Sequence, residues 1–200
     1  MGGLIRAFIA IELSDEAKAE AYAEARTVAR AVQSSLKAGN AGIKWVSEDN
    51  IHLTLRFLGN TDEETLSRAA SVLEGIAAGS GPFPVRLKGL SSFPQGFSSP
   101  TVVWAGLSEG ATESAQLSES IGSALVGLGI PKEGRHFSPH ITLGRVKSGR
   151  NSDKLRKAIE SSTFTASSIT TVDHITLFRS ALAPGGPVYT PISIARLSLP

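Results

Sequence analysis

The sequence contains no cysteine, which excludes disulfide bonds and thiolate metal sites. It also lacks any apolar run that approaches the roughly 20 residues needed for a membrane-spanning helix. The apolar start of the chain, residues 4–12, is too short and too interrupted for the hydrophobic part of a signal peptide. These absences predict a cytoplasmic protein that has no membrane partner.

A large excess of charge of one sign is missing as well. The formal net charge is +2 at pH 7 and the isoelectric point is near 9.0, which suits an anionic substrate without indicating a long nucleic-acid tract. Hydrophobic residues make up 41% and charged residues 19% of the chain, as is ordinary for a globular protein. From the 200 residues we expect a monomer with a single domain over residues 1–200, made of two intertwined lobes.

What the sequence does contain is a repeated motif, His-x-Thr-Leu. His52 begins one copy (HLTL) and His140 begins another (HITL). Each copy lies in a run of β-branched and apolar residues, which predicts a strand. Side chains two residues apart on a strand point to the same face, so each copy presents an imidazole beside the hydroxyl of Thr54 or Thr142. Two such pairs facing one another would surround one small anion, such as a phosphate ester.

A third copy of the motif begins at His174 (HITL), so one of the three needs another explanation. His174 lacks the Ser138-Pro139 sequence that precedes His140, and we expect it to have a structural or rim role. The remaining histidine, His136, is expected to be a loop residue near a cleft between the two lobes.

Two histidines and two threonines suit the opening of a phosphodiester by water. The unperturbed pKa of imidazole is about 6.5, so a neutral ring can accept a proton from water while a protonated ring gives one to the leaving oxygen. Each transfer contributes about 10²–10⁴-fold in rate, and Thr54 and Thr142 can donate hydrogen bonds to the phosphate oxygens. This chemistry requires no metal, and we expect no cofactor. A dinuclear metal site would need carboxylates beside the histidines, and none lies within three residues of His140.

Apolar periodicity predicts strands and helices in alternation along the chain. Strands are expected near 4–12, 43–46, 51–58, 83–90, 101–107, 138–147, 172–179 and 188–196. Helices are expected from Ser14-Asp15 to Gly39, from the capping-box pattern of Thr61 and Glu64 to Gly79, near 112–128 and near 152–161. Because both motif strands are followed by a short turn and a helix, we expect an α+β fold. Two pseudo-symmetric lobes, each a mostly antiparallel sheet with helices on its outer face, would have a cleft between them.

Longer stretches extend these motifs: 6–11 (RAFIAI), 52–59 (HLTLRFLG), 137–146 (FSPHITLGRV) and 175–180 (ITLFRS). They resemble the two-histidine phosphoesterase superfamily, and more narrowly the RNA 2′,3′-cyclic phosphodiesterases, also called LigT or 2′-5′ RNA ligases. The resemblance covers most of the chain. It implies hydrolysis of an RNA 2′,3′-cyclic phosphate to a 2′-phosphomonoester, with a weak reverse ligation that forms 2′-5′ linkages without ATP.

The resemblance also implies that His52 protonates the departing 3′ oxygen and that His140 activates water. It suggests a phosphate contact for Arg145, although strict alternation turns this side chain away from His140 unless Gly144 bends the strand. Otherwise Arg145 is a surface residue.

Two further residues near the first motif are candidates for substrate binding. By alternation, Arg56 shares the face of His52, so it could bind phosphate or form a salt bridge at the end of the strand. Phe57 alternates toward the core, and we expect core packing, although the family suggests that an aromatic near this strand could stack on a base.

Alternatives to hydrolysis of RNA ends remain open from the sequence. The substrate could be a small cyclic nucleotide instead of RNA with a 2′,3′-cyclic phosphate end. The chain could also be a non-catalytic RNA- or nucleotide-binding module of the same fold. A third alternative is a metal hydrolase in which His52, His140 and His174 are the ligands.

Overall fold

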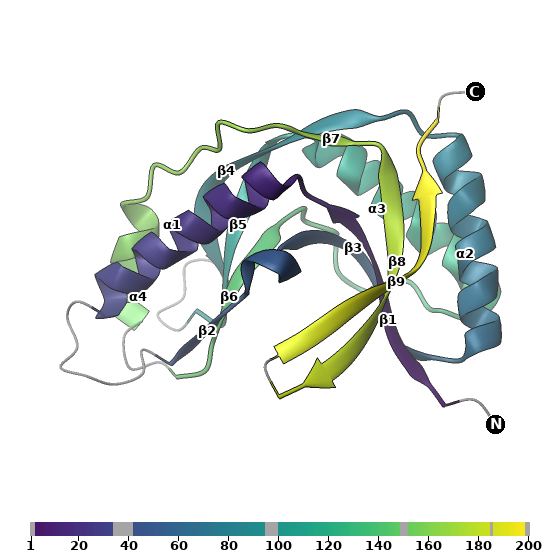
Figure 1. Ribbon diagram of the computed structural model, residues 1–200, viewed down its shortest axis with the longest axis horizontal. Helices are drawn as coiled ribbons and strands as arrows, with labels where there is room; N and C mark the ends of the chain where they lie inside the picture. Colours follow the sequence, from purple (N-terminus) through teal and green to yellow (C-terminus); the bar gives the residue numbers. More distant parts are fainter. Residues whose placement is uncertain (1–2, 34–41, 95–99, 149–151, 185, 199–200) are drawn as a thin grey trace.

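The computed structural model of the protein describes residues 3–33, 42–94, 100–148, 152–184 and 186–198 (Figure 1). Its strands are β1 (Ile5–Glu12), β2 (Ile43–Trp45), β3 (His52–Thr61), β4 (Phe83–Phe93), β5 (Val102–Glu109), β6 (Ile141–Val146), β7 (Thr170–Val172), β8 (His174–Ala183) and β9 (Gly186–Arg196). Its helices are α1 (Asp15–Gln33), α2 (Glu63–Ala78), α3 (Ala111–Leu125) and α4 (Ser152–Glu160), with short 3-10 helices η1 (Glu48–Asn50) and η2 (Val126–Leu128). The predicted end of the first helix at Gly39 lies outside the described residues. Among those residues, no helix is both long enough and apolar enough to cross a membrane.

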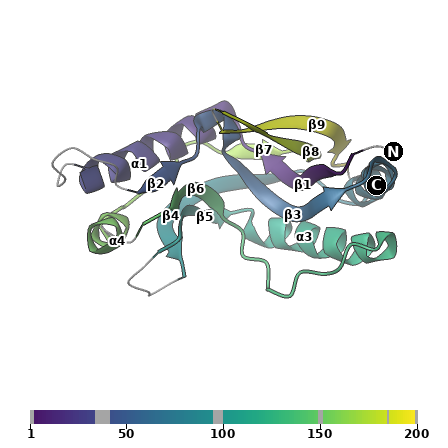
Figure 2. The same ribbon diagram turned by 90° about the horizontal axis from the view of Figure 1, so that it is seen from below.

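The described strands form one sheet in the order β7-β4-β5-β6-β3-β1-β8-β9, with β2 paired to β6. The pairs are antiparallel, and the sheet is strongly curled (Figure 2). Near the middle of the sheet, β3 and β6 are joined at a single residue pair, Leu53 with Ile141. The sheet therefore has two halves that meet at this pair. The curled antiparallel sheet and its helices confirm the predicted α+β architecture.

The helices form two pairs that lie mainly on different halves of the sheet, although α3 also contacts β5 (Figure 1). α1 and α4 pack against each other and against the half with β4 and β6, whereas α2 and α3 pack against each other and against the half with β3, β8 and β9. The buried face of α1 includes Ala17, Ala21 and Ala25, whose spacing of four residues places them on one stripe. These small side chains let α1 lie close to the core that contains Leu53 and Ile141.

Two local predictions are corrected by the structure. The residue that caps α2 is Asp62, whose carboxylate accepts a hydrogen bond from Thr65 N at 2.8 Å, whereas Thr61 is still the last residue of β3. The strand predicted near 172–179 is divided at Asp173, because β7 pairs with β4 and β8 pairs with β1.

Candidate active site

The two motifs lie side by side where the halves of the sheet meet. Leu53 pairs with Ile141, and both side chains are fully buried. Neighbouring residues on a strand point to the opposite face, so the histidine and the threonine of each motif face away from this core. If this antiparallel pairing is extended by one residue in each direction, each histidine comes opposite the threonine of the other motif, as for His52 and Thr142. Where a ladder is regular, such partners are about 5 Å apart at Cβ and diagonal neighbours about 7–8 Å, so the pairing of Leu53 with Ile141 brings the two motifs into the same neighbourhood.

The ring of His52 is oriented by two hydrogen bonds. Nδ1 lies 2.8 Å from the carbonyl oxygen of Asn50, and Nε2 lies 2.9 Å from Oγ1 of Thr54. A carbonyl oxygen can only accept, so Nδ1 carries a hydrogen in every protonation state. In the neutral ring, Nε2 is therefore the free base, and it accepts the hydrogen bond that the Thr54 hydroxyl donates.

Burial lowers the pKa of His52 from the ordinary value of 6.5 to about 4, against the opposing effects of the Asn50 hydrogen bond and the charge of Glu12. Desolvation has this direction because it disfavours the charged form of an imidazole. At neutral pH the free protein therefore holds His52 as a neutral ring.

His140 repeats this arrangement in the second motif. Its Nδ1 lies 2.7 Å from the carbonyl oxygen of Ser138, again two residues earlier in the chain, so Nε2 is again the free base of the neutral ring. Phe93 and Trp104 contact the ring edge-on, with centroid distances of 5.0 and 5.9 Å. The two imidazoles thus have the same tautomer and the same ring nitrogen available for chemistry.

Aromatic side chains also hold the ring of His52. Phe8 stacks on it at a centroid distance of 5.0 Å, and Tyr189 meets it edge-on at 5.3 Å. Burial raises the pKa of Tyr189, while the nearby charges of Arg145 and Arg6 lower it. The positive charges of Arg6 on β1 and Arg145 on β6 are therefore close enough to Tyr189 to lower its pKa.

A β-bulge places Arg145 on the face of the second motif. Trp104 pairs with Thr142, but Val103 pairs with Gly144, so β6 has one extra residue between these two pairs. Alternation is shifted by one residue beyond the bulge, and Arg145 returns to the side of Thr142. Of the two alternatives that the sequence left open for Arg145, the register agrees with a strand bent at Gly144.

Glycine is required at the bulge, because a Cβ on Gly144 would lie 2.9 Å from Cε3 of Trp45. Lys44 of β2 is directly opposite Arg145, so two exposed cationic side chains share the face on which the second motif lies.

The expectation that Arg56 shares the face of the first motif is wrong. The β1–β3 register slips by one residue between Thr54 and Arg56, which sets Arg56 opposite Ile9 on the core side. Arg56 is only 5% exposed. Its guanidinium donates to the carbonyl oxygen of Pro131 and forms an ion pair with Glu133 at 3.5 Å. Arg56 therefore anchors the segment that leads to β6.

The same slip overturns the expectation of core packing for Phe57. Phe57 pairs with Phe8 and has a relative exposure of 53%. The two rings are 6.2 Å apart at their centroids. The Phe57 side chain is thus exposed beside Phe8, the ring that stacks on His52.

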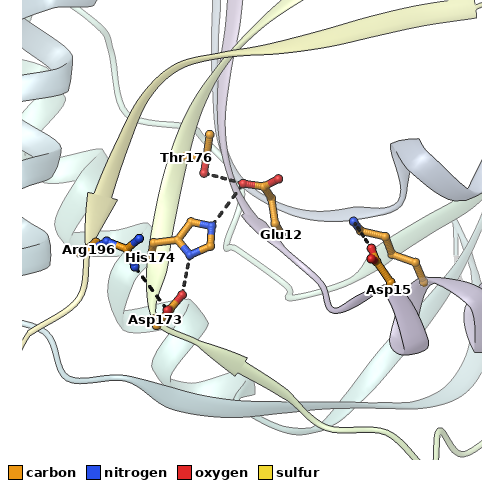
Figure 3. A network of polar contacts seen from close by, with 7 residues as sticks. Glu12, Asp15, Asp173, His174, Thr176 and Arg196 are labelled. Carbon is orange, nitrogen blue, oxygen red and sulfur yellow. Dashed lines mark hydrogen bonds and ion pairs between the residues drawn. The ribbon is translucent and has the colours of Figure 1, made fainter.

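The third copy of the motif holds a carboxylate of the protein itself (Figure 3). Thr176 Oγ1 donates to Glu12 Oε2 at 2.8 Å, and His174 Nε2 lies 3.2 Å from the same oxygen. His174 Nδ1 lies 2.5 Å from Asp173 Oδ1, and this hydrogen bond is the main cause that lowers the pKa of Asp173. A histidine and a threonine two residues apart on a strand therefore hold an oxyanion together in this protein.

Other features surround the paired motifs. A pocket of about 400 Å³ adjoins His52 and is partly lined by Glu12. His136 is exposed and lines a hollow against α3 with Phe137 and Pro139. Within the described parts of the chain, no group of three or more His, Cys, Asp or Glu side chains could hold a metal ion.

The residues at the histidines that sequence reasoning missed include Phe8, Glu12 and Phe93. They are distant from the motifs in sequence and reach them through strand pairing. For Phe8 and Glu12 a signal was present, because they fall on one face of the first strand by alternation. The pairing of β1 with β3 brings both residues to His52.

Similarity to known proteins extends over most of the chain. The family model described as 2′-5′ RNA ligase superfamily matches residues 14–183. A protein of Methanothermobacter thermautotrophicus named RNA 2′,3′-cyclic phosphodiesterase is 34% identical, over 96% of this chain and 99% of its own length. A Thermotoga maritima protein with the same name is 36% identical, over 92% of this chain and 91% of its own.

Solved structures show the same likeness. A protein of Thermus thermophilus superposes with a TM-score of 0.77 and 30% identity, covering 96% of this chain and 98% of its own. Escherichia coli LigT complexed with 3′-AMP superposes with a TM-score of 0.70 and 26% identity, covering 98% of this chain and 99% of its own. In both comparisons the similarity extends over nearly the whole length of the chain.

Proposed function

Because the chain belongs to the 2′-5′ RNA ligase superfamily, we propose that it hydrolyses RNA 2′,3′-cyclic phosphate ends to 2′-phosphomonoesters. The observation that carries the proposal is the pair of His-x-Thr motifs, joined at Leu53 and Ile141 with both rings anchored through Nδ1. The names of relatives such as those of M. thermautotrophicus and T. maritima support the same reaction.

In the proposed mechanism, the two histidines act on opposite sides of the phosphorus atom. His140 Nε2 accepts a proton from water, whose oxygen forms a bond to phosphorus. The bond from phosphorus to the 3′ oxygen breaks, and His52 Nε2 gives that oxygen a proton. The 2′ oxygen keeps the phosphate, which makes the product a 2′-phosphomonoester. The hydroxyls of Thr54 and Thr142 donate to the non-bridging oxygens.

The substrate itself supplies the charge state that His52 needs. In the free protein His52 is neutral at neutral pH, since burial lowers its pKa to about 4. A bound phosphodiester brings a negative charge next to the ring, which favours the imidazolium form. Protonation of Nε2 also ends its acceptance of the Thr54 hydrogen bond, so this hydroxyl becomes free to donate to the phosphate.

RNA fits the surroundings of the motifs better than a small cyclic nucleotide does. The cationic pair Lys44 and Arg145 lies on the face of the second motif, where it can bind a phosphate. The exposed ring of Phe57 can stack on a base. In this proposal the weak, ATP-independent 2′-5′ ligation is the reverse reaction at the same two histidines.

The test uses an oligonucleotide with a 2′,3′-cyclic phosphate end in excess EDTA. We expect turnover to a 2′-phosphate in the wild type and its loss in His52→Ala and in His140→Ala. His136→Ala is the matched control, because it removes an exposed histidine outside the motifs. Binding without turnover would favour a non-catalytic RNA-binding module. Turnover only after divalent metal is added would favour a metal hydrolase.

A further inference from the structure

Glu12 on β1 lies beside His52 on β3. On the opposite side of β1, residues of β8 hold the Glu12 carboxylate in place. The two residues are partners in the β1–β3 register, so their side chains share one face of the sheet. From β8, Thr176 donates to Glu12 Oε2 at 2.8 Å and His174 Nε2 lies 3.2 Å from that oxygen (Figure 3). Thr176 is fully buried, and His174 is braced at 2.5 Å by Asp173. The carboxylate is thus held by side chains of β8.

We propose that Glu12 is a positioning residue that stabilises the imidazolium form of His52 during the reaction. This inference rests on the proposed function, in which His52 must be charged before it can protonate the leaving oxygen. A carboxylate opposite an imidazole favours the charged ring through Coulomb attraction, which is stronger at a half-buried site than in water. Because Glu12 Oε2 already accepts from Thr176, the side chain stays on this face instead of turning to solvent.

The direction of the electrostatic effect agrees with the geometry. Burial lowers the pKa of His52, and the charge of Glu12 opposes that effect. The positive charge of Lys18 could weaken the effect of Glu12 on His52, but Lys18 forms an ion pair with Asp15 at 3.3 Å. Among the described residues, the titratable groups near the Glu12–His52 pair on neighbouring elements include Lys18 on α1, Asp49 on η1, His174 on β8 and Tyr189 on β9, together with His140 of the second motif.

The third motif explains why a carboxylate is stable at this position. Its histidine and threonine grip Glu12 with the same pair of groups that the first two motifs are proposed to offer to phosphate. His174 has a carboxylate at each of its ring nitrogens, Glu12 at Nε2 and Asp173 at Nδ1. Arg196 adds a further contact to Asp173 at 3.5 Å.

The first experiment measures His52 directly. The variant Glu12→Gln keeps an acceptor oxygen for Thr176 but removes the charge. With saturating inorganic phosphate as the anion probe, the ring of His52 is titrated by NMR. We expect its midpoint to lie about one pH unit lower than in the wild type. Glu160→Gln is the matched control, since it makes the same substitution at an exposed position on α4 and is expected to leave the midpoint unchanged.

The second experiment measures kcat against pH on the cyclic-phosphate oligonucleotide. The alkaline limb reports the loss of the His52 proton in the complex, so Glu12→Gln should move it to lower pH. Above the limb, kcat should fall about tenfold, with little change in KM. Thr176→Val keeps the charge but releases the carboxylate, and it should shift the limb in the same direction. Thr176→Ser should restore the wild-type profile.

The outcomes separate this inference from the proposed function. The NMR titration needs no turnover, so a shifted midpoint supports the electrostatic role even if the oligonucleotide is not hydrolysed. An unchanged midpoint in a folded Glu12→Gln protein would overturn the inference, whatever the activity. If Glu12→Gln does not fold, Thr176→Val decides in its place, and an unchanged midpoint there would also overturn it.

Discussion

The hydroxyl of Thr54 lies 2.9 Å from Nε2 of His52, so the two groups of the first motif bond to each other in the free protein. We propose that bound phosphate takes this hydroxyl as a donor. Thr54→Val has nearly the same shape without the donor, and we expect kcat to fall about 10²-fold. The measurement is single-turnover hydrolysis of a cyclic-phosphate oligonucleotide. Thr54→Ser restores the hydroxyl and should recover most of the rate, whereas a fully active Val variant would remove Thr54 from the mechanism.

The lowered pKa of His52 predicts a pH dependence of stability. The unfolded chain binds a proton below about 6.5, but the folded protein resists protonation until about 4. The unfolded state therefore holds more protons within this window, and the free energy of unfolding decreases as the pH falls through it. Below this window the loss in the free energy of unfolding caused by His52 is complete, and it amounts to ~3 kcal/mol.

Urea unfolding of the wild type and of His52→Gln isolates this effect. Carboxyls with lowered pKa values, such as Asp62 and Asp173, also reduce stability in acid, and they do so equally in both proteins. The difference between the two proteins should therefore change by ~3 kcal/mol across the window, with the variant losing less stability. A difference that is constant with pH would show that His52 titrates normally.

The motifs could be predicted because strand alternation is a local property. His52 and Thr54 share a face whatever the rest of the sheet does, and the same holds for His140 and Thr142. The α+β architecture followed from the order of strands and helices for the same reason. Arg56 and Phe57 were placed wrongly because a bulge lies just beyond the first motif.

Bulges and strand order are set by partners that are remote in sequence, which is why these features escaped prediction. Gly144 gave a local sign that left a bend beside Arg145 open as one alternative, but no glycine marks the bulge before Arg56. Glu12 and Phe8 join the site through the β1–β3 pairing, whose register depends on the whole sheet.

Arg56 and Arg145 should respond in opposite ways to the same substitution. Arg56→Met removes the donor to Pro131 O from a buried position. We expect a loss of about 1–3 kcal/mol in stability with little change in KM. Arg145→Met should leave stability almost unchanged and raise KM, because Arg145 is exposed on the face of the second motif. Thermal unfolding measures the stability of both variants, and steady-state kinetics measures their KM. An Arg56→Met variant with unchanged stability and a raised KM would show that Arg56 contacts the substrate.

The glycine at the bulge of β6 can be tested against a matched glycine. In Gly144→Ala, the new Cβ would lie 2.9 Å from Trp45 Cε3 and 3.1 Å from Ile43 Cγ2, so we expect a loss of about 1–3 kcal/mol. Gly75 lies inside α2 with no atom within 4 Å of the added Cβ, so Gly75→Ala should stabilise the protein by about 0.5–1 kcal/mol. Urea unfolding measures the change in the free energy of unfolding for each variant. Changes of the same sign and size in the two variants would contradict the packing argument.

The facing cations Lys44 and Arg145 allow a test of RNA against a small nucleotide as substrate. Like charges directly opposite on neighbouring strands repel each other, and an RNA phosphate bound between them would relieve that repulsion. Lys44→Met should therefore raise KM several-fold for an oligonucleotide and reduce the salt dependence of its binding by about one unit in slope. A 2′,3′-cyclic mononucleotide has no second phosphate to place there, so its KM should be unchanged. Equal effects on both substrates would instead mean that Lys44 acts on the reacting phosphate itself.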